Sequence, residues 1–581
     1  MTGLASTLAT IWRLAAPYFR SEDRLAGRLL LAAVVSIELT IVAISVLLNQ
    51  WNNRFYNALQ DRNWDTFVSE LMIFCGLAAA FIVLAVYQLY LNQWLQIRWR
   101  QWMTKAYLGV WLDGANHYRM QLLGDAADNP DQRLTEDIQM FVERTLSIGI
   151  GFLSAVVTLG SFIVILWGLS AAAPLHLFGG EWSIPGYLVW AALIYALAGT
   201  LLTHLIGWPL VQLNFNQQRY EADFRFNLVR VRENSEQIAL LHGEPAETDR
   251  LLARFGRVVG NFLLIMSRTK KLTFFTAGYQ QISLVFPYVV VSPAYFAGKM
   301  QLGGLMQTAS AFNSVQTSLS FFITVYRQLA EWRAVIQRLA GFQLGAAAAR
   351  AAAATPPVVE VEPAAGRTAI EIDDLAVRLP DGRPLVSGSS LAVPAGDRVL
   401  VTGPSGSGKS TLFRAIAGIW PFGKGRIVVP KDARLMMLPQ RPYFPVGTLA
   451  AAVTHPAEAG AYGSERIAEA LRAVGLPALV ERIEEDAHWN RMLSLGEQQR
   501  LGIARALLQE PDYLFLDEAT ASLDEASEAA LYRLLQERLP ETTIVSIGHR
   551  STLVAFHRRR LSFERDGDQH QVRETALGPA R

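Results

Sequence analysis

The chain has 581 residues, of which 51% are hydrophobic and 18% are charged, and its mean hydropathy is +0.21. Soluble proteins average about 25% charged residues, so this composition indicates that a large part of the chain lies in a membrane. The formal net charge is only +2 and no long run of Lys and Arg occurs, which argues against nucleic acid as a partner.

Residues 1–25 open with apolar residues at helical spacing between Leu4 and Phe19, followed by Arg20 and Arg24. This pattern predicts an amphipathic helix that lies on the cytoplasmic membrane surface. The alternative is an ordinary amphipathic helix of a soluble protein, which the adjoining apolar segment makes less favourable.

Six apolar segments are long enough to cross a hydrocarbon core of about 30 Å as helices. They are residues 26–48, 67–91, 148–169, 187–210, 274–297 and 304–325. Among the segments that connect the spans, those between spans two and three and between spans four and five hold most of the Lys and Arg, which predicts that both segments and both termini are cytoplasmic. We therefore expect an all-α, six-span domain over residues 26–343.

The two basic segments mix charged and apolar residues at helical spacing, which predicts helical extensions into the cytosol. Their tips are natural places to contact an ATPase domain and transmit its motion. Near one tip, Glu236 and Gln237 are candidate coupling residues. The alternative is a solvated helix end.

Several polar residues fall inside the expected spans, where an ionisable group usually faces a bundle interior or a watery cavity. The candidate cavity residues are Glu38, Gln280, Gln281, Gln307, Asn313 and Gln316. They favour a hydrophilic cavity for polar or amphiphilic cargo. For the amides the alternative is hydrogen bonding between helices, and Glu38 has proton coupling as a second alternative.

An Ala- and Pro-rich segment, residues 344–367, predicts a linker, followed by an α/β ATPase domain over 368–570 and a tail over 571–581. A phosphate-binding loop opens this domain between a strand-like and a helical segment. Its residues are Gly403, Pro404, Ser405, Gly406, Ser407, Gly408, Lys409, Ser410 and Thr411. We expect Lys409 to bind the β- and γ-phosphates of ATP and Ser410 to coordinate Mg²⁺.

Two carboxylates, Asp517 and Glu518, follow the apolar run that starts at Tyr513. A buried strand ending in two acids suits one Mg²⁺-linked group and one general base. We assign Asp517 to the metal and Glu518 to the attacking water.

The segment Leu493, Ser494, Leu495, Gly496, Glu497 and Gln498 resembles the signature motif of ABC transporters. Gln440 then matches the family's Q-loop, Asp524 its D-loop and His549 its switch histidine. The resemblance implies catalytic roles for Glu518, His549 and Gln440, with Gln440 also at the metal. It also implies that Ser494 and Gly496 cap ATP held by the partner's Lys409, so that the chain acts as a half-transporter in a homodimer; a heterodimer is the alternative.

The chain departs from the common family pattern at two places. The signature reads LSLGE, with Leu495 and Glu497 in place of Gly and Gln, which is similar to the peroxisomal D-type subfamily and its bacterial relatives. Leu379 stands where an adenine-stacking aromatic is expected, so we expect loose base selectivity.

The membrane half resembles the BacA/SbmA family of peptide uptake proteins, in LLNQWNNRFYNALQDRNW from Leu47, NPDQRLTEDI from Asn129 and GGLMQTASAFNSVQTSLSFF from Gly303. This resemblance implies an exporter-type fold used to import hydrophilic cargo such as antimicrobial or bleomycin-like peptides and corrinoids. The D-type resemblance implies a fatty acid, its CoA ester or a lipid instead. The alternative outside the transporters is a membrane-tethered regulatory ATPase. We expect a bacterial inner membrane, with membrane lipid as a partner, and a peroxisomal membrane as the second choice.

Overall fold

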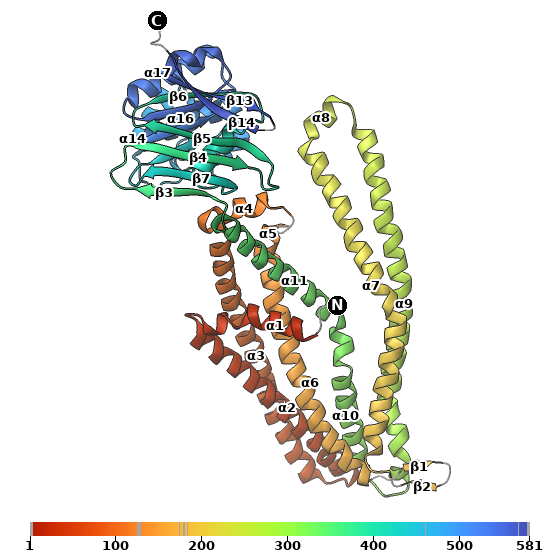
Figure 1. Ribbon diagram of the computed structural model, residues 1–581. Helices are drawn as coiled ribbons and strands as arrows, with labels where there is room; N and C mark the ends of the chain where they lie inside the picture. Colours follow the sequence, from red (N-terminus) through yellow and green to blue (C-terminus); the bar gives the residue numbers. More distant parts are fainter. Residues whose placement is uncertain are drawn as a thin grey trace. The chain divides into compact units, whose positions relative to one another are not determined.

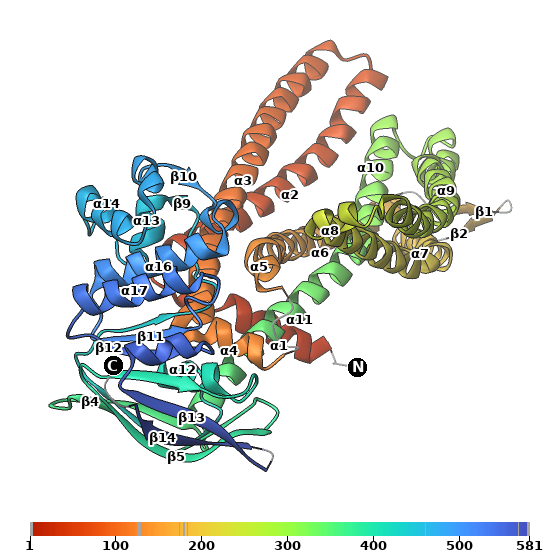
Figure 2. The same ribbon diagram turned by 90° about the horizontal axis from the view of Figure 1, so that it is seen from above.

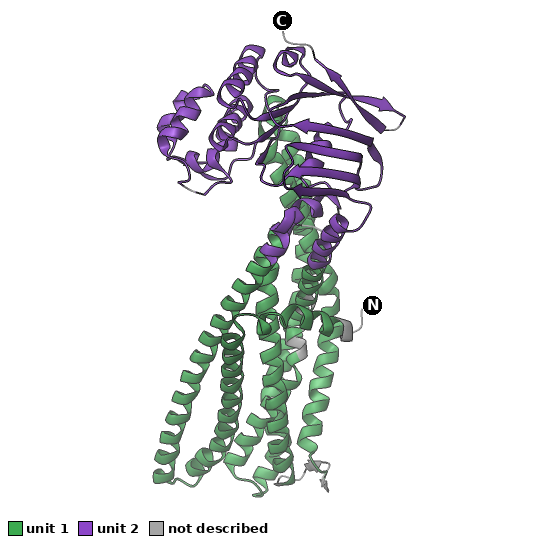
Figure 3. Ribbon diagram, turned by 60° about the vertical axis from the view of Figure 1, so that its left-hand side comes forward, with its two compact units in different colours: residues 1–106, 131–340 green, residues 107–130, 341–581 purple. Residues whose placement is uncertain are grey.

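The computed structural model describes residues 4–124, 129–172, 175–177, 180–182, 184–458, 460–567 and 569–577. The chain forms two compact units (Figure 3). Unit 1 comprises residues 1–106 and 131–340, and unit 2 comprises residues 107–130 and 341–581.

Unit 1 is built from helices, most of them long (Figure 1). They are α1 (Leu4–Ala15), α2 (Arg24–Gln60), α3 (Trp64–Leu112), α5 (Pro130–Gln132), α6 (Ile138–Ala172), α7 (Tyr187–Glu233), α8 (Ser235–Leu240), α9 (Glu244–Phe296), α10 (Leu302–Leu319) and α11 (Phe321–Ala354). A short hairpin, β1 (Leu175–Leu177) with β2 (Gly180–Trp182), connects α6 to α7. The ends of α3 and α11 continue into unit 2.

Five helical segments in the described part of the chain are long and apolar enough to cross a membrane. They are Arg24–Gln60, Trp64–Leu122, Pro130–Ala171, Tyr187–Glu233 and Glu244–Phe296, and they contain the first five expected spans. The sixth expected span, residues 304–325, covers α10 and the start of α11, which are separated at Ser320. This segment is not among the five, and its crossing of the membrane stays a prediction.

The helices α3, α7 and α9 are 49, 47 and 53 residues long. A span needs only about 20 residues, so each helix continues far beyond the bilayer. This confirms that the two basic segments are helical. Within unit 1, α7 and α9 lie side by side (Figures 1 and 2), and Asn261 of α9 donates hydrogen bonds to the Leu213 carbonyl and to Gln217 Oε1, both at 2.9 Å.

The core of unit 1 lies where α6, α7, α9 and α10 meet. Phe162, Leu166, Leu188, Val291 and Phe312 are buried there, each at most 2% exposed. Many other apolar side chains of α7 and α9 are exposed, as is expected of helices that face lipid or a second chain.

Unit 2 is organised around a ten-stranded sheet with the order β3-β7-β4-β5-β14-β13-β6-β12-β11-β8. Its strands are β3 (Val359–Ala364), β4 (Ala369–Arg378), β5 (Pro384–Pro394), β6 (Arg398–Thr402), β7 (Gly423–Pro430), β8 (Leu435–Leu438), β11 (Tyr513–Asp517), β12 (Thr543–Ile547), β13 (Arg559–Asp566) and β14 (Gln569–Ala576). The strands β13, β6, β12, β11 and β8 run parallel, and β4 and β5 form an antiparallel pair.

Helices cover both faces of the parallel strands (Figure 2). They are α12 (Lys409–Ile416), α13 (Leu449–Thr454), α14 (Ser464–Ala473), α15 (Trp489–Met492), α16 (Leu495–Gln509) and α17 (Glu525–Arg538), while the two-residue strands β9 (Gly447–Thr448) and β10 (Asp486–Ala487) pair separately. Burial on both faces explains why these strands read as continuous apolar runs. The expected α/β ATPase fold is therefore present.

The expected boundaries of this domain were wrong at both ends. The segment 344–367 is not an irregular linker, because α11 continues to Ala354 and β3 joins the sheet beside β7. Alanine is the strongest helix former, so an Ala-rich stretch without an amphipathic pattern still extends a helix. The expected tail 571–581 contains most of β14, which pairs with β13.

Candidate functional site

The phosphate-binding loop connects β6 to α12, as its sequence predicts. Gly403 has φ +150°, and a Cβ there would lie 2.6 Å from Phe563 Cβ. Gly408, the N-cap of α12, has φ +95°. Only glycine adopts these conformations readily, and they leave the loop wrapped around the start of α12. The first N–H groups of a helix have no partner within it, so this end can bind a phosphate.

Two side chains of the loop fit an anion. The Ser407 hydroxyl is buried and has no hydrogen-bond partner among the described residues. Lys409 is 6% exposed and its Nζ donates to the carbonyls of Gly403 at 2.9 Å and Pro404 at 2.7 Å. Burial lowers the pKa of Lys409, and the nearby carboxylates of Glu518 and Asp517 oppose this shift. A bound phosphate would stabilise the charged ammonium further.

Ser410 and Asp517 form the pair expected at Mg²⁺. The Ser410 hydroxyl lies 2.8 Å from Asp517 Oδ1. Burial raises the pKa of Asp517 from its usual value, while the Ser410 hydrogen bond lowers it. Among the described residues no group of three His, Cys, Asp or Glu side chains could hold a metal ion. Mg²⁺ at ATPase sites is held by one or two carboxylates together with substrate phosphates, and its binding here stays a prediction.

Glu518 lies at the end of β11 and is contacted by two of the expected catalytic residues. Gln440 Nε2 donates to Glu518 Oε2 at 3.1 Å, and His549 Nε2 lies 3.1 Å from Glu518 Oε1. The Glu518 side chain is 30% exposed, so a water molecule can reach it. Its φ of +52° is rare for a residue other than glycine, and such backbone strain is concentrated at functional sites.

Gln499, which the sequence interpretation missed, connects three of these elements. Its Nε2 donates to the Gln440 carbonyl at 3.0 Å and to the Glu518 carbonyl at 3.4 Å. Its Oε1 accepts the N–H of Ser522 at 3.0 Å. Gln499 is 1% exposed. A glutamine one residue beyond the signature gives no local signal of this role, because its partners are far away in the sequence.

The signature segment begins α16, and Ser494 is the N-cap of that helix. Ser494 and Glu497 form a capping box in which the Ser494 N–H and hydroxyl donate to Glu497 Oε2 at 2.9 and 2.7 Å. Such a box satisfies two backbone donors at a helix start. Glu497, one of the departures from the common signature, therefore orders the start of this helix.

Asp524 and Leu379 also have defined places. Asp524 is the N-cap of α17 and accepts the Ser527 N–H at 2.9 Å, which lowers the pKa of its carboxyl. Leu379 is half-buried beside the hydrophobic core that contains α12. Its N–H donates to the Arg383 carbonyl at 2.8 Å in a tight turn.

One of the two expected cytosolic tips, the one that contains α4 (Asn116–Leu122), packs on the ATPase core within unit 2. Tyr118 and Leu122 of α4 pack against the core cluster around α12. The spacing of these two apolar residues by one helical turn was a signal that could have found them. Glu236 and Gln237 are exposed in α8 of unit 1, and their coupling role stays a prediction.

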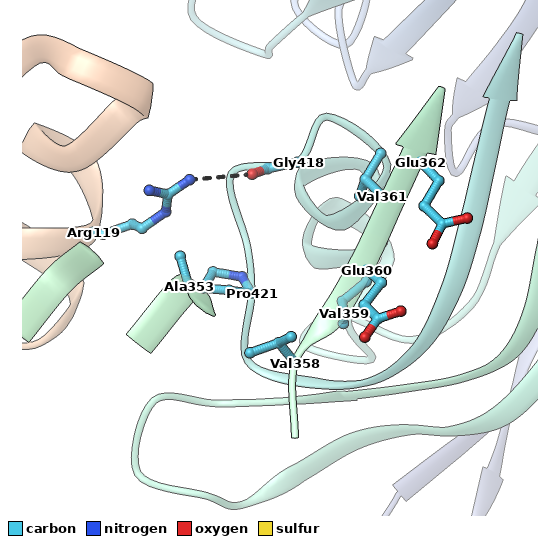
Figure 4. Close-up of a pocket in the computed structure, with 9 residues that line it drawn as sticks. All are labelled: Arg119, Ala353, Val358, Val359, Glu360, Val361, Glu362, Gly418 and Pro421. Carbon is cyan, nitrogen blue, oxygen red and sulfur yellow. Dashed lines mark hydrogen bonds between the residues drawn. The ribbon is translucent and has the colours of Figure 1, made fainter. Parts of the chain in front are cut away.

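Arg119, which is itself a residue of α4, points toward the loop after α12 (Figure 4). Its Nη2 lies 3.5 Å from the Gly418 carbonyl, and burial lowers the pKa of its guanidinium. The two residues line a cavity of about 360 Å³ with Val358, Glu360 and Pro421. The junction between α4 and the ATPase fold is therefore partly polar and incompletely filled.

The candidate cavity residues separate into different environments. Glu38 and Asn313 line one pocket of unit 1. Gln280 and Gln281 are exposed on α9 and do not line it. Their place in a hydrophilic cavity stays a prediction.

Gln307 and Gln316 are buried and bonded to neighbouring helices. Asn49 and Asn53 of α2 donate to the Gln307 carbonyl at 3.0 Å and to Gln307 Oε1 at 2.7 Å. The Ser283 hydroxyl of α9 donates to Gln316 Oε1 at 3.1 Å. For these two amides the alternative of hydrogen bonding between helices is the correct one.

Comparisons with known proteins agree with this geometry. Residues 14–296 match the family model of ABC transporter transmembrane region 2, and residues 386–521 match that of the ABC transporter ATPase region. The chain is 34% identical to the inner membrane ABC transporter ATP-binding protein YddA of Escherichia coli, over 92% of this chain and 93% of that protein. The chain belongs to the ABC transporter family.

Two further relatives carry the name of the D subfamily. The ABC transporter D family member 2, chloroplastic, of Arabidopsis thaliana is 34% identical over 96% of this chain and 86% of its own length. The lysosomal cobalamin transporter ABCD4 of Homo sapiens is 26% identical over 93% of this chain and 91% of its own length. This ABC transporter is therefore a half-size member with a fused ATPase, related to the ABCD proteins.

The fold also matches a solved structure. A bacterial Atm1-family ABC exporter with ATP bound gives a TM-score of 0.72 at 18% identity, and the match covers 95% of both chains. The expected exporter-type fold is confirmed, and a half-transporter of this fold implies dimerisation in a lipid membrane. The protein is an ATP-hydrolysing ABC transporter.

Proposed function

We propose that this ABC transporter is a homodimeric importer of polar peptides in a bacterial inner membrane. The observation that carries the cargo class is the polar pocket of unit 1, lined by Glu38 and Asn313. A lipid carrier would be expected to present an apolar wall to its cargo. The name of the Escherichia coli relative as an inner membrane protein supports the location.

For ATP hydrolysis we propose that Lys409 and the phosphate-binding loop hold the phosphates and that Glu518 accepts the proton of the attacking water. Gln440 and His549 hold the two carboxylate oxygens of Glu518, which fixes the direction of its free lone pairs. Ser410, Asp517 and Gln440 would hold Mg²⁺, which neutralises charge that develops on the phosphate oxygens. No protein-phosphate bond is formed in this scheme.

The signature segment is assigned to the partner's nucleotide. Ser494 and Gly496 would cap ATP held by Lys409 of the second copy, so both ATP sites need two chains. Closure of the ATPase dimer would then move the membrane helices through α4, since Tyr118 and Leu122 pack on the ATPase core, and through α8 with Glu236 and Gln237.

Two other classes of cargo would be detected by the transport assay described below. The human relative is named a cobalamin transporter, which favours a corrinoid, and the D-subfamily relationship favours an acyl-CoA or a lipid. A regulatory ATPase would move none of them. Purified protein in proteoliposomes loaded with ATP separates these classes. A peptide should be taken up, whereas uptake of only the corrinoid or only the acyl-CoA would refute the peptide proposal.

A further inference from the structure

The helices α2, α3, α6 and α10 surround a pocket of about 640 Å³ within unit 1. Eleven of its sixteen lining residues carry a hydroxyl, amide or carboxylate group. Pockets for small ligands span roughly 300–1,000 Å³, so this pocket is large enough for a small ligand or for one segment of a larger one. It is polar although the helices around it belong to the membrane domain.

Many polar groups of this pocket are not used by the protein itself. Asn92 Oδ1 is buried without a hydrogen-bond partner, and the side chains of Ser154, Thr158, Asn313 and Thr317 make no hydrogen bond within the described residues. Polar groups away from water are almost always paired in folded proteins. Asn92 Oδ1 therefore needs water or a ligand, and the other four side chains, of which Asn313 and Thr317 are exposed, are free to bind one.

A second polar cluster between α2 and α10 shows the contrast. There Gln307 and Asn49 exchange hydrogen bonds at 3.0 and 3.2 Å, and Asn57 accepts the Gly303 N–H at 2.7 Å. That cluster is satisfied internally and joins two helices. The pocket around Asn313 has the opposite character, which is that of a binding surface.

Glu38 is the only charged residue among the described residues that line the pocket. Gln88 Nε2 donates to Glu38 Oε2 at 3.0 Å, while Oε1 has no partner in the described structure. A carboxylate at this depth is costly unless it is paired with a cation or hydrated. Among the described residues no Lys or Arg lines the pocket, so the cargo is the candidate source of a cation.

We infer that Glu38 binds an ammonium or guanidinium group of the cargo, while the neutral wall formed by Asn92, Thr158, Asn313 and Thr317 binds its amide groups. This inference rests on the proposed transport of peptides and names the subsite that selects them. Glu38 is thus a residue for charge selection, and an anionic cargo such as an acyl-CoA is repelled from the same place.

The test compares two probes on full-length protein in nanodiscs. One is a fluorescent, terminally blocked peptide with two lysines, and the other is the same peptide with both lysines acetylated. Wild type is expected to bind the cationic peptide about tenfold more tightly. Glu38→Gln should abolish this preference and leave affinity for the acetylated peptide unchanged, since a charged hydrogen bond is replaced by a neutral one.

Three controls make the result decisive. Asp65→Asn removes an exposed carboxylate of α3 that is outside the pocket and should keep the full preference. Glu38→Asp keeps the charge and should keep most of the preference even if Glu38→Gln fails to fold. Asn313→Ala should weaken both peptides by a similar factor of about three, because it removes a neutral hydrogen bond.

The inference is overturned if Glu38→Gln keeps the tenfold preference, or if wild type binds both peptides equally. Uptake by wild-type proteoliposomes separates this failure from that of the proposed function. Uptake of both peptides with equal affinity refutes the subsite alone, whereas uptake of neither peptide refutes peptide transport itself.

Discussion

Replacing Glu518 with Gln tests the assignment of the general base. The amide retains the shape of the side chain and the left-handed backbone at this position (φ +52°). It can still accept a hydrogen bond from Gln440 or His549, which lie 3.1 Å from the two carboxylate oxygens. What it loses is the ability to accept a proton from water.

The magnitude follows from these contacts. A positioned general base contributes about 100- to 10,000-fold to the rate, or about 3–5 kcal/mol of activation free energy at 1.36 kcal/mol per tenfold. At most one hydrogen bond to Gln440 or His549 is lost, at about 0.5–1.5 kcal/mol. We therefore expect kcat to fall at least about 100-fold while KM for ATP changes less than about tenfold.

The assay is phosphate release by full-length protein in nanodiscs over a range of ATP concentrations. Glu484→Gln, at an exposed carboxylate of the same unit, is the matched control and should retain wild-type turnover. Undiminished turnover by Glu518→Gln would refute the assignment. An equal loss in kcat and ATP affinity would instead point to a general distortion of the site.

Three further predictions concern adenine, the metal pair and coupling. Leu379→Tyr supplies the missing aromatic side chain and should lower KM for ATP about tenfold, with little effect on KM for CTP, which has no purine. If the ratio of the two KM values is unchanged, adenine lies elsewhere. Asp517→Asn should raise the Tm of nucleotide-free protein at pH 7.5 while hydrolysis is lost. Burial raises the pKa of Asp517, so above that pKa the ionised side chain destabilises the folded wild-type protein. This destabilisation is lost as the pH falls through the folded-state pKa of Asp517. A lower Tm for the variant would contradict this expectation. Tyr118→Ala should leave basal hydrolysis within about twofold and reduce transport about tenfold, because Tyr118 packs α4 on the ATPase core; parallel loss of both activities would mean that it only stabilises the fold.

Local patterns predicted most of the ATPase half. The apolar run from Tyr513 to Leu516 is a strand buried on both faces, and the loop from Gly403 leads into α12, because both features depend on neighbours in the sequence. The helix start at Ser494 is also a local feature, because serine is a preferred N-cap residue. The alanines before Thr355 were misjudged because the lack of an amphipathic pattern was given more weight than intrinsic helix propensity.

Long-range contacts were less accessible to sequence interpretation. Whether an amide in a span joins helices or lines a pocket depends on the residue opposite: Gln307 meets Asn49 across 258 positions, while Asn313, six residues later, faces the pocket. Periodicity places both on one helix without saying what faces them. The one-turn spacing of Tyr118 and Leu122 marks an apolar face of α4, but it does not say that the ATPase core covers that face.

ATP-dependent accumulation in sealed membrane vesicles of both orientations tests the central claim most directly. An importer that uses cytoplasmic ATP should extrude a cationic peptide from inside-out vesicles preloaded with it and should accumulate it in right-side-out vesicles loaded with ATP, and Glu518→Gln should do neither. Accumulation in inside-out vesicles, movement of lipid alone, or no movement of any cargo despite ATP hydrolysis would contradict the account.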